Sequence, residues 1–500
     1  MKVLVIILLI ALGILYASTL HSYLGLSNND DAQYIILAKA LASGQGYRSI
    51  NYPYNPLQTV YPFIFPLLLT PIVYFFGYNF LLMRILILFF GLGSLYLIYW
   101  MFRQKKDEEF ALLCMLLVGI SPILYFYQTI IISEIPYIFF SLLALFFIES
   151  YANTDSVLNK YLFISCGFTI ISFFTRMAGI SIFLGAFFYL FLKKRLTIKK
   201  INFLKKVLVF VVICGLPFFS WIIMGHSPVG RSFDYTDQFF AMKHYDDEAG
   251  IINFIDLFSR VKNNFKYYAN ALVFDQFFIY YKLPAALRNA FALFFMSLFV
   301  FGFLEKLIIK KSIFEFYFLF YCLLFLSWPF QEMRFLVPIL PFSTYYLVSG
   351  LITFASRIKK VSYLFLVITL SVIILFDFLG LNYISKRFIR ITHGQSPVYK
   401  WVIKNVPLNS VIIYRFTATM FLLTGRKTIL YPWTNSDNRF FRYLRMFNID
   451  YVIVDKITTE TVKYLIPFIE KYPEIFTSVA KFRNSEVFKI EKAKIKLDEN

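Results

Sequence analysis

The sequence predicts an all-α polytopic membrane bundle of about 12 or 13 transmembrane helices, followed by a small α/β domain outside the membrane. Of its 500 residues, 59% are hydrophobic and 21% are aromatic, and the mean hydropathy is +0.66. Soluble domains contain about 45–50% apolar residues, so this composition excludes an ordinary soluble protein. Apolar runs long enough to span a bilayer recur throughout residues 1–381, whereas residues 382–500 contain none.

The predicted spans follow one another with short connections. They cover residues 2–20, 61–77, 79–102, 109–128, 133–150, 160–175, 177–192, 203–224, 286–306, 313–330, 335–355 and 361–381. The first run is longer than the apolar part of a usual signal peptide and lacks a clear cleavage site, so we expect an uncleaved helix. Prolines 62, 66 and 71 favour a broken or re-entrant segment over 61–77, which leaves the number of crossings open.

Much of the net charge of +21 lies in short loops between predicted spans. The basic loops are "RQKKDEE" (103–109), "KKRLTIKKINFLKK" (193–206), "EKLIIKK" (305–311) and "RIKK" (357–360). Lys and Arg are enriched in cytoplasmic loops, so we expect a multi-pass protein of the cell (plasma) membrane with these loops inside. Counting crossings from them places the loops 21–60 and 225–285 and the C-terminal domain outside. The basic excess thus reflects topology, and no nucleic-acid partner is expected.

The sequence contains no motif that predicts a metal site or a disulfide bond. All four cysteines lie inside apolar runs, without a CxxC motif or a Cys/His cluster: Cys114, Cys166, Cys214 and Cys322. The loop stretch "KHYDDEAG" (243–250) carries one histidine and three acids, but their spacing matches no metal motif. A solvated acidic turn is therefore the favoured interpretation, and we predict no metal and no cofactor.

The segment 382–500 predicts a small α/β domain. Residues 396–406 and 458–472 have helical spacing, with Ser396-Pro397 and a Thr-rich stretch at their starts. "SVIIY" (410–414) and "YVIVD" (451–455) predict short buried strands, and "FTSVAKFR" and "EVFKIEK" predict a closing strand pair. No catalytic constellation appears here. We expect a folded cap on the outer side, and the alternative is a part that holds an acceptor.

Two adjacent acids, Asp30 and Asp31, follow the first span in "SNNDDAQYIILAKALASGQGY" (27–47), with Tyr34 one helical turn later. The stretch predicts a short amphipathic helix on the membrane face, and both carboxylates fall at its start. Acids there stabilise a helix by roughly 0.5–1 kcal/mol, so capping explains the pair as readily as chemistry does.

Further charged residues lie beside apolar spans at the predicted outer face. Glu134 precedes one span, Arg176 separates two, and Glu332 and Arg334 occupy the turn "FQEMRF" (330–335). An ionisable group so close to membrane depth indicates a functional site. The alternatives are a solvated turn residue for Glu134 and snorkelling anchors for the arginines.

Distant parts of the chain thus bring acids and arginines to one side of the membrane: Asp30, Asp31, Glu134, Arg176 and Arg334. A carboxylate can accept the proton of an acceptor hydroxyl or amine. Arginines can stabilise the charge that grows on a departing lipid phosphate. Together they predict glycosyl transfer from a polyprenyl-phosphate sugar to an acceptor outside the membrane.

The order of several short motifs resembles the GT-C superfamily of integral-membrane glycosyltransferases, in particular the protein O-mannosyltransferase and aminoarabinose transferase branch. The motifs are "DDAQYIILAKALASGQGY", "YPFIFPLLLTPIVYFFG", Arg84 with Gly91 and Gly93, Ser121-Pro122, Ser133-Glu134, Thr175-Arg176 with Gly179, and Arg334 to Pro341. Each motif is weak alone, but together they extend over nearly the whole chain. The resemblance implies a GT-C-like bundle with an outside α/β domain.

The resemblance also implies roles for single residues. Asp30 takes the place of the family's proposed catalytic base, and Asp31 stands where the family more often has Glu. The resemblance implies inversion at the sugar carbon and no divalent metal in this branch.

Near the proline-rich entry the sequence departs from the family, because Gln58 precedes Tyr61-Pro62 where a Lys or Arg is usual. Arg176 and Arg334 are therefore the expected contacts of the donor phosphate. Glu134 is the third expected catalytic acid. Tyr34, Tyr61 and Glu332 are expected to shape the substrate site.

The expected partners are a polyprenyl-phosphate sugar donor, membrane lipid, and an acceptor that is a lipid, a glycan or a protein. The alternatives are a transporter or flippase of lipid-linked glycans, or a polymerase that uses them. A transporter usually has repeated halves and charges near mid-membrane, whereas this sequence has no visible internal repeat.

Overall fold

The computed structural model describes residues 1–24, 29–193, 200–224, 235–242, 250–271, 284–309, 311–357, 362–391, 397–455 and 459–495. The acidic loop stretch 243–249, considered above as a cation site, lies outside the described residues.

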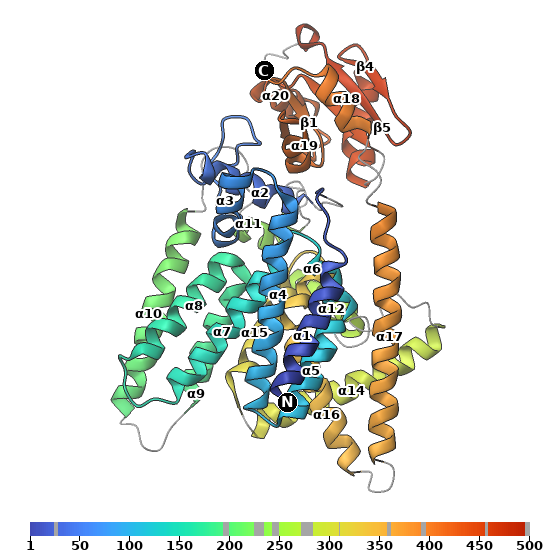
Figure 1. The fold of residues 1–500 in the computed structure, drawn as a ribbon. Coiled ribbons are helices and arrows are strands. Elements are labelled where there is room, and N and C mark those ends of the chain that lie inside the picture. The colour runs from blue at the N-terminus through green and yellow to red at the C-terminus, as the bar shows by residue number, and fades with distance from the viewer. Residues whose placement is uncertain are drawn as a thin grey trace.

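Helices make up the first four fifths of the chain. They are α1 (Lys2–Ala17), α2 (Asp30–Ala42), α3 (Ile64–Phe76), α4 (Phe80–Arg103), α5 (Glu108–Ile120), α6 (Pro122–Gln128), α7 (Glu134–Ala152), α8 (Lys160–Thr175), η1 (Met177–Gly179), α9 (Ile180–Leu192), α10 (Lys200–Met224), α11 (Tyr235–Phe240), α12 (Phe254–Asn270), α14 (Ala285–Ile309), α15 (Ile313–Ser327), η4 (Met333–Ile339), α16 (Leu340–Arg357) and α17 (Ser362–Ile391). Figure 1 shows them as one bundle, with the N-terminus at the end opposite to the C-terminal sheet.

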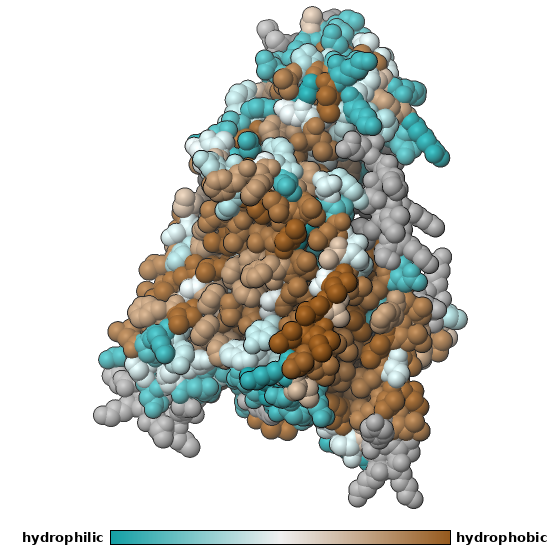
Figure 2. Space-filling view, in the orientation of Figure 1, coloured by the Kyte–Doolittle hydropathy of each residue, from teal (hydrophilic) through white to brown (hydrophobic). Residues whose placement is uncertain are grey.

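Each predicted span falls on an apolar helix, so the predicted fold class is confirmed. Among the described residues, 6 helices are long and apolar enough to cross a membrane, or up to 7 if the pair α5–α6, bent by 58°, is one span. The remaining predicted spans correspond to shorter apolar helices, namely α1, α3, α8, η1–α9 and α15. Apolar side chains cover the bundle in Figure 2, and hydrophilic ones gather at its two ends. The chain is a multi-pass membrane protein.

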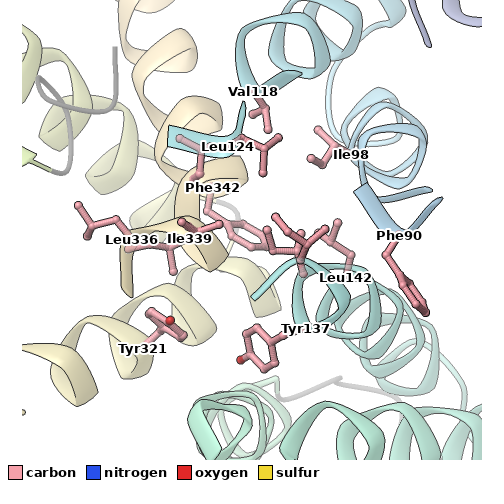
Figure 3. Packing of buried hydrophobic residues seen from close by; sticks show 14 of the residues in the cluster. Phe90, Ile98, Val118, Leu124, Tyr137, Leu142, Tyr321, Leu336, Ile339 and Phe342 are labelled. Carbon is pink, nitrogen blue, oxygen red and sulfur yellow. The ribbon is translucent and has the colours of Figure 1, made fainter. Parts of the chain in front are cut away.

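The packing of the bundle interior brings α7, α15 and η4 together. Figure 3 shows Ile339 and Phe342 in the centre of the packed side chains, near Leu142 of α7. Tyr137 of α7 and Tyr321 of α15 lie beside them, with ring centroids 6.5 Å apart. This close packing fixes the first turn of α7 against the start of η4, which are the positions of Glu134 and Arg334.

Helices α14 and α16 cross at two glycines. A Cβ on Gly302 would overlap the main-chain oxygen of Tyr346, and a Cβ on Gly350 would overlap the oxygen of Leu298. Small residues allow such close approach between membrane helices. We expect Gly302→Ala to lower the free energy of unfolding by about 1–3 kcal/mol, because the backbones must separate.

Thermal or denaturant unfolding in detergent measures this effect. Gly167→Ala in α8 is the matched control, because nothing lies within 4 Å of a Cβ at that position. Equal stability of the two variants would contradict the close crossing of α14 and α16.

The C-terminal part is a five-stranded sheet with helices. Its elements are α18 (Pro397–Asn405), β1 (Val411–Ile413), α19 (Thr417–Thr424), β2 (Lys427–Ile429), α20 (Asp437–Met446), β3 (Tyr451–Asp455), η5 (Thr461–Leu465), α21 (Ile466–Lys471), β4 (Phe476–Lys481), β5 (Ser485–Ile490) and η6 (Lys492–Lys494). The strand order is β2-β1-β3-β5-β4, with β1 parallel to β2 and β3, and β5 antiparallel to β3 and β4. The predicted central strands and closing pair are present, whereas α19, β2 and α20 were not predicted.

Helix α2 corrects one expectation. Instead of lying on the membrane surface with a polar face outward, it is buried over most of its length between α3 and α19. Its polar Gln33 is tolerated inside because its side-chain oxygen accepts a hydrogen bond from Asn51 (3.1 Å). The first acid-bearing helix is therefore a core element that joins the bundle to the C-terminal part.

Residue Asn29 fixes this junction. It precedes α2 with a φ of 73°, and its side-chain oxygen accepts hydrogen bonds from the amides of Ala418 (2.8 Å) and Thr419 (3.2 Å). It thereby caps α19, not its own helix. The loop behind α2 adds further links, since the Thr428 amide donates to the Asn51 carbonyl (2.9 Å). The loop and the C-terminal part thus form one outer layer above the bundle (Figure 1).

Candidate active site

An acid–arginine cluster lies where α2 meets η4. The Arg334 guanidinium forms ion pairs with Asp30, the first residue of α2, and with Glu332. The Tyr61 hydroxyl donates a hydrogen bond to the second oxygen of the Asp30 carboxylate (2.7 Å). Residues separated by about 300 positions are thus in direct contact, as expected from their common predicted face.

A second ion pair lies directly behind the first. Glu134 begins α7 and is 1% exposed, and its carboxylate lies 2.5 Å from the Arg176 guanidinium. The Arg334 Nε atom is 3.9 Å from the same Glu134 oxygen, so both arginines face one buried acid. Arg176 reaches it because the chain is extended between α8 and η1, with φ −148° and ψ 135°.

Tyrosines hold the two ion pairs together. The Tyr34 hydroxyl and the Ser133 hydroxyl are hydrogen-bonded at 2.9 Å, one residue before Glu134. The rings of Tyr34 and Tyr61 meet edge to face, with centroids 5.2 Å apart. The predicted substrate-shaping tyrosines therefore belong to the frame of the cluster.

The surroundings shift the pKa values of the two more accessible acids, Asp30 and Glu332, in opposite directions. Burial disfavours ionisation of Asp30, but the Arg334 guanidinium and the Tyr61 hydrogen bond outweigh it and lower the pKa of this carboxyl. Burial raises the pKa of Glu332 above its usual value, although Arg334 opposes the shift. Asp30 is therefore the carboxylate that stays ionised and can accept a proton.

Asp31 is placed apart from its neighbour. Its side chain is 1% exposed and accepts a hydrogen bond from the Ala32 amide (2.8 Å), and it does not line the cavity described below. Its charge interacts with the buried Arg84 guanidinium, which donates to the carbonyls of Leu24 and Thr129 (2.9 Å each). The Asp31 charge thus interacts with the arginine that anchors the segment before α2.

One cavity of about 1950 Å³ opens over the cluster. Its bundle side is formed by six of the predicted site residues, namely Asp30, Tyr34, Tyr61, Arg176, Glu332 and Arg334. Glu134 lies behind the two arginines and does not line it. The opposite side is formed by the C-terminal part, so the cavity lies between the bundle and the outer layer.

The C-terminal residues of this cavity were not predicted; they include Arg415, Trp433, Arg439, Arg442 and Tyr443. Arg439 and Arg442 are three apart on α20, one face of a strongly amphipathic helix. That spacing is visible in "DNRFFRYLRM", but the partner face across the cavity is known only from the fold.

The described residues contain no group of three or more His, Cys, Asp or Glu side chains that could hold a metal ion. The acids of the cluster contact arginine guanidinium groups instead. The absence of a metal from the reaction stays a prediction.

Comparison with known proteins adds a family match. The family described as dolichyl-phosphate-mannose-protein mannosyltransferase matches residues 60–221, which include Tyr61, Glu134 and Arg176 and make up less than half of the chain. Among curated protein sequences, none matches the chain significantly.

Solved structures match over nearly the whole chain. ArnT from Cupriavidus metallidurans bound to undecaprenyl phosphate superposes with a TM-score of 0.58 at 10% identity, covering 98% of this chain and 97% of ArnT. The oligosaccharyltransferase AglB from Archaeoglobus fulgidus, in complex with an inhibitory peptide and a dolichol-phosphate, gives 0.58 at 13% identity, with 94% and 72% covered. The same enzyme with Zn and sulfate gives 0.62 at 15% identity, with 94% and 71% covered.

At these identities the structural matches establish the fold, and the family match adds a sequence signature within it. The resemblance predicted from the ordered motifs is thereby confirmed. The chain has the fold of the GT-C membrane glycosyltransferases, and its residues 60–221 match the dolichyl-phosphate-mannose-protein mannosyltransferase family.

Proposed function

We propose that the protein transfers a sugar from a polyprenyl-phosphate donor to an acceptor on the outer side of the membrane, with inversion at the sugar carbon. The single observation that carries the proposal is the contact between Asp30 and Arg334 on the wall of one large cavity. A proton acceptor and a cation for the leaving group lie together there, next to the bundle.

In the proposed reaction an acceptor hydroxyl or amine attacks the anomeric carbon. The new bond forms as the bond from that carbon to the phosphate oxygen breaks, and the acceptor proton moves to the Asp30 carboxylate. The electron pair of the broken bond stays on the polyprenyl phosphate. Arg334 and Arg176 stabilise this charge, because both guanidinium groups line the cavity.

Arg334 would contact both the proposed base, Asp30, and the donor phosphate. In the structure its guanidinium pairs with Asp30 and lowers the pKa of that carboxyl. A donor phosphate would compete for the same guanidinium and weaken the pair, and the basicity of Asp30 would then rise. Donor binding would in this way prepare the base. Glu134, buried between the two arginines, would hold them in place.

The solved relatives support the choice of donor. ArnT and AglB were solved with undecaprenyl phosphate and dolichol-phosphate, and both share the fold of this chain. We further propose residues 1–381 as the transferase domain and 382–500 as a second, extracytoplasmic domain. The last predicted span is part of α17, which continues to Ile391 and leads to the C-terminal part (Figure 1).

Turnover of the donor tests the proposal. Purified protein in lipid nanodiscs is incubated with radiolabelled undecaprenyl- and dolichyl-phosphate sugars and a cell-envelope extract as the acceptor source. We expect release of free polyprenyl phosphate together with labelled acceptor. Movement of intact donor across a vesicle membrane, without cleavage of the sugar–phosphate bond, would instead support a transporter.

The pH dependence of the reaction is expected to follow Asp30. Because its pKa is lowered, kcat/KM should persist below the usual aspartate range of about pH 4 and fall as Asp30 becomes protonated. The same sign applies to stability: the ion pair contributes above the pKa of the unfolded state and is lost as pH falls through the lowered folded value. In Arg334→Gln the largest effect that opposes burial is lost, whereas the Tyr61 hydrogen bond and the Arg176 charge remain, so the pH at which activity falls in acid should move upward.

The matched control is Lys39→Gln, which removes an exposed cation from α2, the helix that carries Asp30. This variant should leave the pH at which activity falls in acid unchanged. A fall in activity at the same pH in Arg334→Gln and the unmodified protein would remove Asp30 as the titrating base.

A further inference from the structure

The cavity extends well beyond the acid–arginine cluster. Its volume of about 1950 Å³ exceeds the roughly 300–1,000 Å³ of a usual small-molecule pocket. The cluster occupies the bundle side, and the outer side is formed by α20 and by the segments around Arg415 and Trp433. A second substrate therefore has room, and the outer side is the part of the wall that it would contact.

This outer side is strongly basic. It carries three arginines, Arg415, Arg439 and Arg442, which we call the arginine wall, against one acid, Glu460. Arg415 is balanced by Asp455, whose carboxylate lies 3.6 Å from its guanidinium and is 2% exposed. The two arginines of α20 are exposed, and the described residues give the Arg442 guanidinium no ion pair.

Aromatic rings stand beside the arginine wall. Trp433 lines the cavity and stacks on Tyr464, with ring planes 12° apart and centroids separated by 6.3 Å. The Tyr443 hydroxyl donates to the Leu430 carbonyl (2.6 Å), which fixes its ring on the same side. Rigid aromatic faces between cations suit a ligand with flat apolar surfaces and anionic groups.

We propose that the arginine wall is the acceptor subsite and that the acceptor is an anionic glycan, bearing phosphate or carboxylate groups. This inference rests on the proposed transferase function and adds the acceptor class to it. Arginine forks donate paired hydrogen bonds to phosphate and carboxylate oxygens, and the sugar rings lie against Trp433. A neutral peptide would add no counter-charge for the exposed Arg442 guanidinium.

The location of the subsite fits this role. Asn29, the residue before Asp30, accepts hydrogen bonds from the amides of Ala418 and Thr419 in α19, which begins two residues after Arg415. An acceptor bound at the arginine wall therefore lies in the same cavity as the proposed base, on the side away from the bundle. The donor phosphate would lie against Arg176 and Arg334, so the two anionic groups are held on separate cations.

Binding of defined oligosaccharides to the full-length protein in nanodiscs tests the inference without requiring turnover. The probes are fluorescent trigalacturonate, a phosphorylated trisaccharide and neutral trigalactose, with a Ser/Thr-rich peptide as the competing class. We expect at least one anionic trisaccharide to bind roughly 10-fold or more tightly than the neutral one, and to weaken as salt rises. The carboxylated and phosphorylated probes separate the two anionic groups.

The double variant Arg439→Gln/Arg442→Gln should lose roughly 10-fold of that affinity. Arg445→Gln is the matched control: it lies on the same helix, but it does not line the cavity. This binding is measured without turnover, whereas Asp30→Asn is tested by turnover, so a failed base and a failed subsite are distinguishable. Equal binding of charged and neutral probes, no anionic binding, or peptide binding that is insensitive to the double variant would each overturn the inference.

Discussion

Asp30→Asn is expected to lower the rate of sugar transfer by about 10²–10⁴-fold, because the amide cannot accept the proton of the acceptor. The fold should remain, since Arg334 keeps its contacts with Glu332 and Glu134 and the asparagine oxygen can still accept from Tyr61. Release of polyprenyl phosphate in nanodiscs measures the loss. Thermal unfolding should change little, and donor binding should not weaken, because the asparagine no longer competes with the phosphate for Arg334.

Asp31→Asn is the matched control for this prediction. Its carboxylate is the immediate neighbour and is fully buried, but it does not line the cavity. We expect this variant to be destabilised, because the charge that interacts with Arg84 is lost, and to retain transfer per folded molecule. Transfer that survives Asp30→Asn and disappears in Asp31→Asn would reverse the assignment of the base.

Arg176→Gln is expected to produce the second large effect, on both stability and transfer. It leaves Glu134 buried with its nearest remaining cation, Arg334, 3.9 Å away. Breaking a buried ion pair from one side costs about 3–5 kcal/mol. Loss of one stabilising group for the leaving phosphate lowers the rate by about 10²–10³-fold. Denaturant unfolding and donor release measure the two effects separately.

The double variant Glu134→Gln/Arg176→Gln separates structure from chemistry. Two neutral amides remove the unpaired buried charge, so stability should largely return, whereas transfer should stay low because the guanidinium is absent. Lys105→Gln is the control, since the Lys105–Glu149 pair is partly exposed and lies outside the cavity. Recovery of transfer in the double variant would show that Arg176 acts only by balancing Glu134.

The predicted acids and arginines lie close together in the fold, whereas helix α2 lies elsewhere than predicted. Asp30 and Arg334 were expected at one face because both follow or precede apolar spans, and the fold places them in contact. Helix α2 was expected at the membrane surface because Asp30, Asp31, Gln33 and Lys39 are polar. Asn51 donates a hydrogen bond to the Gln33 side-chain oxygen and Arg334 pairs with Asp30, and such partners from distant segments are invisible to local periodicity.

The sequence by itself determined the membrane bundle, because about 20 apolar residues are needed to cross a bilayer and few other structures tolerate such runs. It also determined the central and closing strands of the C-terminal part and the candidate acids and arginines. Only the tertiary structure decided which acid faces the cavity. Asp30 and Asp31 are chemically alike and adjacent, but successive residues of a helix point in different directions, so Asp30 pairs with Arg334 at the cavity and Asp31 is buried away from it. The arginine wall depends on the fold in the same way, because α20 contributes to the cavity only when the outer layer closes over the bundle.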